Sequence, residues 1–148
     1  MTGVAVSTTP IKMATLDLAL ERLPDGAAVF GLGLDQPLYF SAHSTWGKFA
    51  LPGKAVVHVA KYAASDDRGE LEGFADLLMP GWRDVVLHAR FLPDMTVAHA
   101  IPGVGGRPDV TALGLDKIRI AGDWVGPEGM LGDAAFASGL RAAKSLIA

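Results

Sequence analysis

The chain has 148 residues, half of them hydrophobic and 20% charged, and its 13 basic and 16 acidic side chains leave a formal net charge of -3. This length predicts about one domain, and the composition is that of a globular rather than a disordered protein. No basic excess is present to neutralise phosphates, so nucleic acid is not an expected partner. The absence of cysteine excludes disulfides, thiolate metal sites and a cysteine nucleophile.

The sequence shows no targeting or membrane-spanning segment. Residues 1–20 lack a basic cluster followed by an apolar run, and Asp17 interrupts the one candidate run, so we expect no secretory signal. No stretch contains the roughly 18 consecutive apolar residues that span a bilayer. We therefore expect a cytoplasmic protein without a transmembrane segment.

The first part of the chain is predicted to consist of strands separated by tight turns. The expected strands are residues 15–20, 27–34, 38–41 and 55–62. Pro24 and Gly26 favour a turn after the first strand, because proline presets φ and glycine accepts a positive φ. The run at 55–62 is the clearest strand because it is rich in β-branched residues. The short connections favour an antiparallel sheet.

The second part of the chain mixes helices and strands. Leu71, Phe74, Ala75 and Leu78 recur at helical spacing and predict a helix over 68–79, which ends at the following Pro-Gly pair. We then expect a strand over 84–92, for which a helix is the alternative because the spacing does not decide. A turn at 93–94, strands at 95–100 and 117–121, and a helix over 129–147 are expected to follow. Together these elements predict an α+β fold with a mainly antiparallel sheet and flanking helices.

Residues 118–135 form the segment that points most directly to a ligand. A strand ending in Gly122 and Asp123 is followed by a glycine-rich turn and then by a helix that starts with small side chains. Such a helix start offers unpaired amides and a partial positive charge, which suit a phosphate or a polarised carbonyl oxygen. Glycines in the turn would let a flat ligand approach the backbone. The alternative interpretation is an ordinary C-terminal helix with a glycine-rich beginning.

The run from Ala121 to Gly139, AGDWVGPEGMLGDAAFASG, resembles the C-terminal flavin-contacting segment of FAD-dependent oxidoreductases of the amine-oxidase superfamily. The resemblance is to the phytoene desaturases and protoporphyrinogen oxidases within that superfamily. Residues 37–41, 80–82 and 90–93 more weakly resemble the later part of the substrate domain of such enzymes. The resemblance implies FAD as the cofactor and a small hydrophobic substrate.

The resemblance also implies roles for individual residues. Gly122 and Asp123 match the pair that lies near the ribityl or pyrophosphate part of FAD. Gly129, Met130 and Leu131 match the helix start beside the isoalloxazine ring, where backbone amides can stabilise negative charge on the reduced flavin. The cofactor-binding residues implied by the resemblance are Gly122, Asp123, Gly129, Met130, Leu131 and Ala134, the last on the small face of the helix.

The sequence departs from this family at one important point. The family binds FAD through an N-terminal strand, loop and helix with a G-x-G-x-x-G motif, and no such motif is present; the glycines at 31–33 and 103–105 are interpreted as turn residues. The resemblance therefore implies that residues 1–113 are a partial substrate domain, with a sheet that roofs the substrate pocket. Residues 114–148 would be the last strand and helix of an FAD-binding domain.

A chain of this kind is expected to need further polypeptide. An N-terminal FAD domain would be its missing partner, FAD affinity of the isolated chain should be low, and surfaces left exposed could support a homo-oligomer. Whether the chain is an enzyme stays open, since the oxidoreductase activity belongs to the full-length context. The alternative is a non-catalytic small α+β domain that binds an apolar ligand or a partner protein.

The remaining reactive side chains do not predict a metal site or a catalytic site. The four histidines, at positions 43, 58, 88 and 99, lack metal-ligand spacing and are interpreted as packing or surface residues, so no metal is expected. Ser41, His43 and Ser44 lack a nucleophile elbow, and no catalytic acid or base is assigned. Arg107 is expected to form a salt bridge, with contact to an acidic substrate as the alternative.

Overall fold

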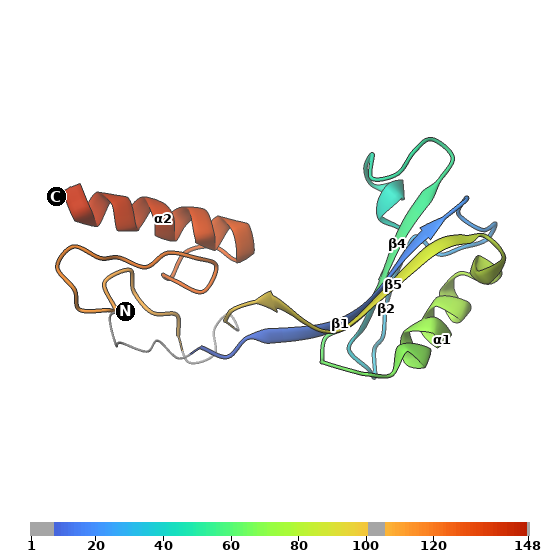
Figure 1. Cartoon of the computed structure of the whole chain (residues 1–148), viewed down its shortest axis with the longest axis horizontal. Coiled ribbons are helices and arrows are strands. Elements are labelled where there is room, and N and C mark those ends of the chain that lie inside the picture. Colours follow the sequence, from blue (N-terminus) through green and yellow to red (C-terminus); the bar gives the residue numbers. More distant parts are fainter. Residues whose placement is uncertain (1–7, 101–105, 148) are drawn as a thin grey trace. The chain divides into compact units, whose positions relative to one another are not determined.

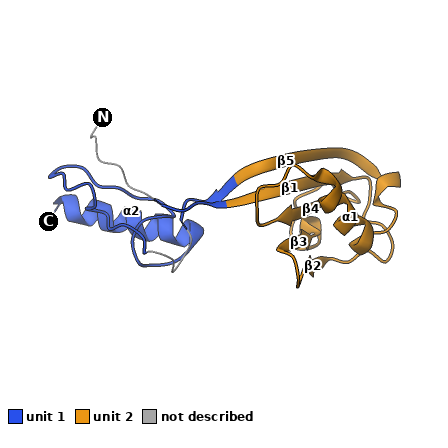
Figure 2. Ribbon diagram, turned by 90° about the horizontal axis from the view of Figure 1, so that it is seen from below, with its two compact units in different colours: residues 1–11, 96–148 blue, residues 12–95 orange. Residues whose placement is uncertain are grey.

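The computed structural model describes residues 8–100 and 106–147, which belong to two compact units (Figure 2). Unit 2 is Lys12–Met95, and unit 1 joins Met1–Ile11 to Thr96–Ala148. The predicted α+β class is confirmed. The predicted division between residues 113 and 114 concerns the parts of a larger enzyme and stays a prediction.

A five-stranded sheet dominates unit 2 (Figure 1). Its strands are β1 (Ile11–Leu20), β2 (Phe30–Leu32), β3 (Leu38–Ser41), β4 (Ala55–Lys61) and β5 (Val86–Ala98), in the order β2-β3-β4-β1-β5. The pairings of β2 with β3, β3 with β4 and β4 with β1 are antiparallel. The helical elements of unit 2 are η1 (His43–Thr45), α1 (Arg68–Leu78) and η2 (Trp82–Asp84).

One face of the sheet packs against α1 and forms the core of unit 2. Successive side chains of a strand point to opposite faces, so Leu16 and Leu18 of β1 and Val59 of β4 share the face that buries Leu71 and Ala75 of α1. All five side chains are at most 1% exposed. The residues between them on β1 and β4 lie on the opposite face, which we name the open face.

The turns predicted at Gly26 and at the Pro80-Gly81 pair, and the first helix, are confirmed. Gly26 has φ +75° and Gly81 has φ +79°, the left-handed region that glycine adopts without steric cost. Helix α1 begins after Asp67, whose side chain accepts a hydrogen bond from Glu70 N at 3.3 Å. This side-chain cap satisfies one of the amides that a helix start leaves without an intrahelical partner.

The turn predicted at 93–94 is wrong, because β5 runs without interruption through Pro93. Proline cannot donate to a strand ladder and is tolerated on an edge strand. Strand β5 is at the edge of the sheet, and the carbonyl of Pro93 still accepts a hydrogen bond from Ser65 N at 3.0 Å. The two strands expected at 84–92 and 95–100 are therefore one element.

Unit 1 is built around one long helix, α2 (Leu131–Ile147). The strand predicted at 117–121 is wrong in this structure: the segment has no ladder partner among the residues described for unit 1. One backbone-to-backbone hydrogen bond involves this segment among the described residues, from Ile120 N to Val110 O at 3.0 Å. The Arg119 guanidinium instead donates to the carbonyls of Leu115, Asp116 and Ile118. A strand requires a neighbouring strand to pair its backbone groups.

Within the parts of the chain that are described, no helix is both long enough and apolar enough to cross a bilayer.

Candidate functional site

The residues before α2 and the start of that helix come together in one corner of unit 1. Ser138 of α2 lies beneath Gly122, with its Oγ 3.0 Å from both the amide nitrogen and the carbonyl oxygen. Ser138 and Ala134 are fully buried on the same side of the helix. Ala134, expected on the small face beside a cofactor, therefore packs inside unit 1 in this structure.

Arg107 holds the turn between Asp123 and α2. Its Nη1 donates to Asp123 O at 3.3 Å, and its Nη2 donates to Glu128 O at 3.2 Å and to Gly129 O at 2.9 Å. The expected salt bridge of Arg107 is absent among the described side chains, since the guanidinium pairs with backbone carbonyls instead. One cation thus fixes the path of the glycine-rich turn.

The Asp123 carboxylate is paired with His99, a partner that the sequence did not indicate. Oδ1 lies 3.1 Å from His99 Nδ1, and Oδ2 accepts a hydrogen bond from His99 N at 3.2 Å. The Asp123 side chain is 21% exposed and that of His99 63% exposed. A carboxylate has about four lone-pair sites, so Asp123 keeps acceptor capacity for a ligand hydroxyl.

The start of α2 is exposed and under backbone strain. Met130 and Leu131 are each 57% exposed, and Leu131 has φ +50°, a left-handed conformation that costs a non-glycine residue about 1–2 kcal/mol. Gly129 has φ +67°, and a Cβ there would lie 2.8 Å from Asp133 Cβ, so glycine is required. Asp133 N donates to Met130 O at 3.1 Å.

Two backbone amides at this helix start have no hydrogen-bond acceptor within residues 8–100 and 106–147. They are Leu131 N and Gly132 N. A Cβ built on Gly132 would meet no atom within 4 Å, so the space there is free. Unpaired amides at the positive end of a helix are suited to an anion or a polarised oxygen. This corner is accordingly the candidate ligand site of unit 1.

A cavity of about 460 Å³ lies beside the same turn. It is lined by Gly106, Arg107, Asp109, Gly126, Pro127 and Arg141. Arg141 Nη2 is 2.6 Å from Asp109 Oδ2, and hydrogen bonds from Thr111, first from its backbone amide, hold the Asp109 pKa below its usual value. Both guanidinium groups at this cavity are thus already bonded within the chain.

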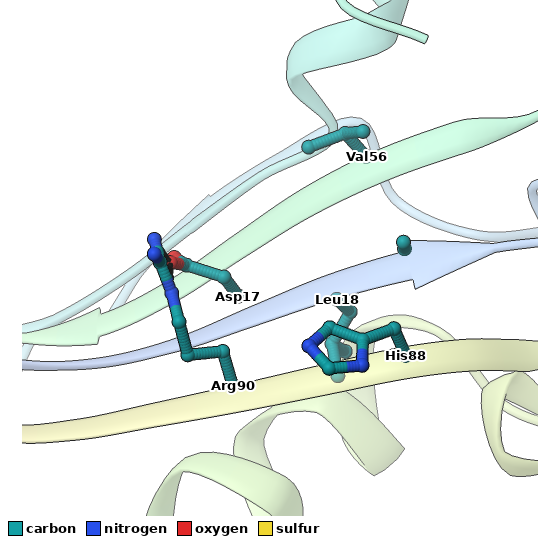
Figure 3. Close-up of a pocket in the computed structure, with 6 residues that line it drawn as sticks. Asp17, Leu18, Val56, His88 and Arg90 are labelled. Atoms are coloured by element: carbon teal, nitrogen blue, oxygen red, sulfur yellow. Dashed lines mark hydrogen bonds and ion pairs between the residues drawn. The ribbon is translucent and has the colours of Figure 1, made fainter. Parts of the chain in front are cut away.

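A second cluster lies on the open face of the sheet in unit 2. Asp17 of β1 binds two cationic or ionisable side chains, with Oδ1 2.6 Å from His58 Nδ1 and Oδ2 2.6 Å from Arg90 Nη2. Figure 3 shows the Arg90 side chain from β5 reaching the Asp17 carboxylate beside a cavity of about 200 Å³. The Asp17 side chain is 17% exposed.

His43 extends this cluster. Its ring centroid is 4.3 Å from that of His58. Burial lowers the pKa of His43 below its usual value, the neighbouring His58 lowers it further, and Asp17 partly offsets both effects. The sequence interpretation of His43 and His58 as isolated packing or surface residues missed this grouping. Strand alternation is a signal that could have placed Asp17 and His58 away from the core, but the register that pairs them was not available from the sequence.

Neither cluster is a metal site: within residues 8–100 and 106–147, no group of three or more His, Asp or Glu side chains could hold a metal ion. Comparison of the chain with protein-family models, with curated proteins and with solved structures finds no match.

Proposed function

We propose that this chain is the C-terminal part of an FAD-dependent oxidoreductase that oxidises or desaturates a small hydrophobic substrate. In this proposal the N-terminal dinucleotide-binding domain is supplied by polypeptide outside the present sequence. The observation that carries it is the turn that Arg107 holds between Asp123 and the start of α2, where the Leu131 and Gly132 amides have no acceptor among the described residues. The flavin would supply the redox chemistry, and the chain would supply binding and electrostatics.

The chemistry of this corner fits two parts of an FAD molecule. The amides of Leu131 and Gly132, at the positive end of α2, could stabilise negative charge that develops on a reduced isoalloxazine ring. Asp123 could accept hydrogen bonds from ribityl hydroxyls. At Gly122 the Trp124 indole lies where a Cβ would be, so this glycine serves the packing of Trp124 in this structure. The exposure of Met130 and Leu131 supports a ligand at this place, because their large apolar side chains contribute no burial energy while they face solvent. The backbone strain at Leu131 supports it as well, because strained residues are often found at binding sites.

The exposed side of α2 supports the proposal that a further domain packs against this helix. Phe136, Leu140 and Ile147 are 84%, 58% and 87% exposed and recur at helical spacing. We name these three residues the α2 stripe. Exposed large apolar side chains along one side of a helix are typical of an interface. The unpaired segment 117–121 supports the same proposal, since a neighbouring domain with a sheet would supply the strand partner that it lacks.

The proposal is tested by flavin retention. The 148-residue chain is incubated with excess FAD, desalted and examined for flavin absorbance, alone and after mixing with a separately produced FAD domain of the amine-oxidase type. We expect flavin to be retained only in the mixture. Asp123→Ala should reduce retention, whereas Asp116→Ala, an exposed carboxylate of the same unit, should not.

Two results would contradict the proposal. If flavin is absent from the mixture as well as from the isolated chain, the start of α2 does not contribute to FAD binding as proposed. If the Asp123→Ala and Asp116→Ala variants retain equal amounts of flavin, Asp123 is not a cofactor-binding residue. Circular dichroism of both variants establishes that the comparison is between folded proteins.

The second candidate function is a non-catalytic α+β domain that binds an apolar ligand. The observation that favours it is the core of unit 2, which is complete enough to bury Leu16, Leu18 and Val59 almost entirely. This candidate predicts no flavin retention under either condition and ligand binding by the chain alone.

A further inference from the structure

The loop between β3 and β4, residues 42–54, exposes three large apolar side chains. Trp46, Phe49 and Leu51 are 65%, 67% and 73% exposed. The loop begins with η1 and lies on the side of the sheet opposite α1 (Figure 1), where His43 contacts His58 of the open face. Large apolar side chains that cluster on a surface contribute no burial energy there, and such clusters mark interaction sites.

The same loop carries positive charge that no acidic residue of the segment balances. Residues 36–65 include three lysines and neither Asp nor Glu, in a chain whose net charge is -3. Lys61 is paired with Glu70. Lys48 and Lys54 are exposed, and neither forms an ion pair with any side chain that the structure describes. The exposed apolar side chains are therefore accompanied by two cations.

The cations and the apolar surface adjoin each other. Lys48, Leu51 and Lys54 line one hollow of about 420 Å³. A partner that covers Leu51 would therefore also meet both ammonium groups, and negative charge on that partner would be attracted to them.

The loop is held in shape by its own hydrogen bonds. The Trp46 amide donates to His43 O at 3.0 Å, and the Lys54 amide donates to Leu51 O at 2.9 Å. The Val56 amide of β4 donates to Ser44 Oγ at 3.2 Å, which ties the beginning of the loop to the strand that follows it. A loop that is already ordered loses less conformational entropy when it binds.

We propose that residues 42–54 dock on an anionic lipid surface, with Trp46, Phe49 and Leu51 inserted among the headgroups and the two lysines against lipid phosphates. Tryptophan is enriched at membrane–water interfaces, and lysines near an anionic leaflet are attracted to it. A lysine can also bury its alkyl stem while its ammonium group stays in water. A protein partner fits less well, because lysine is depleted in protein–protein interfaces. The contact uses unit 2 alone, so the proposal does not depend on flavin binding.

Cosedimentation of the 148-residue chain with lipid vesicles tests the proposal. The vesicles consist of phosphatidylcholine alone, or of phosphatidylcholine and phosphatidylserine in equal amounts. We expect binding to the mixed vesicles to be about 30-fold tighter, because each of two lysines contributes about 5-fold. Added salt should weaken this binding, because it screens the attraction between exposed charges.

Two pairs of substitutions separate the contributions of charge and insertion. Lys48→Gln with Lys54→Gln should remove most of the preference for mixed vesicles, whereas Lys117→Gln with Lys144→Gln, exposed lysines of unit 1, should not. Trp46→Ser with Phe49→Ser should weaken binding to mixed vesicles about 10-fold or more, because two large apolar side chains no longer insert. The matched control is Phe136→Ser with Leu140→Ser on the α2 stripe, which should leave binding unchanged.

Fluorescence reports insertion directly. The emission of Trp46 should shift to shorter wavelength on mixed vesicles as the indole leaves water. Trp46→Phe keeps an aromatic ring and should still bind, but it should lose this shift.

The lipid proposal is overturned if the chain does not bind mixed vesicles, if it binds both kinds of vesicle equally, or if a control pair has the same effect as its loop pair. It is also wrong if vesicles are not bound and Trp46→Ser with Phe49→Ser instead reduces self-association in sedimentation velocity. In that case the loop is an interface between copies of the chain. Circular dichroism establishes that every variant compared is folded.

Discussion

Ser138 binds both backbone polar groups of Gly122: its Oγ lies 3.0 Å from the Gly122 amide nitrogen and 3.0 Å from the carbonyl oxygen. The same Oγ is 3.0 Å from Ala135 O, within its own helix. One side chain of α2 thus fixes the backbone immediately before Asp123. The position of the candidate site depends on this contact, because it ties the turn to the helix whose start offers the open amides.

Replacement of Ser138 by alanine is expected to destabilise unit 1 by about 1–3 kcal/mol, since the part-buried Gly122 amide loses its acceptor. The measurement is hydrogen exchange by mass spectrometry over residues 117–147. Ser145→Ala is the matched control on α2. Its partner Arg119 has four further carbonyl acceptors, including the backbone carbonyl of Ser145 itself, so a smaller effect is expected. Equal effects of the two variants would show that the Ser138 contact does not hold the turn.

The low pKa of His43 predicts a pH dependence of stability. Burial first, and then the neighbouring His58, keep the pKa of His43 in the folded chain below its usual value of 6.5. The unfolded state therefore binds more protons between these two values, and the free energy of unfolding rises with pH across that window. This contribution is complete above about pH 6.5 and is lost as the pH falls towards the folded-state pKa.

Urea unfolding at a series of pH values measures this effect. His43→Gln, which stays neutral, should lack the part of the pH dependence between the folded-state pKa and pH 6.5. Parallel curves for wild type and His43→Gln would mean that another group is responsible.

The buried Thr15 hydroxyl has no hydrogen-bond partner among the described residues and is expected to lower stability. Thr15→Val should raise the free energy of unfolding by about 1 kcal/mol, because a buried hydroxyl without a partner carries a desolvation cost that valine does not. Thr96→Val, at an exposed strand position, should change it by less than about 0.5 kcal/mol. Chemical denaturation of the three proteins makes the comparison, and destabilisation by Thr15→Val would argue that the hydroxyl is satisfied.

The α2 stripe is expected to cause self-association when the proposed partner domain is absent. Replacing Phe136 and Leu140 together by serine should shift the chain towards monomer in sedimentation velocity, with little loss of stability, since both side chains are largely exposed. Leu77→Ser is the control: this leucine of α1 is 73% exposed but lies outside the stripe. A wild-type chain that is monomeric at high concentration would contradict the prediction.

Local patterns in the sequence were sufficient to predict several secondary-structure elements. The β-branched run predicted β4, helical spacing predicted α1, and the prolines before Gly26 and Gly81 predicted turns that the structure confirms. Local patterns failed at Pro93, where the sheet edge accommodates a proline that would interrupt a central strand. They failed again at 117–121, where strand-forming residues have no strand to pair with among the described part of unit 1.

The candidate sites also depend partly on local sequence order and partly on contacts between distant residues. The order Gly122, Asp123, glycine-rich turn and helix is a local feature, so the sequence by itself was sufficient to single out this segment as a candidate ligand site. Contacts between residues far apart in the chain were decided by tertiary structure: His99 with Asp123, and His58 and Arg90 with Asp17, 41 and 73 residues away. Periodicity shows which face of a strand a side chain occupies, but the pairing register decides which side chains share that face.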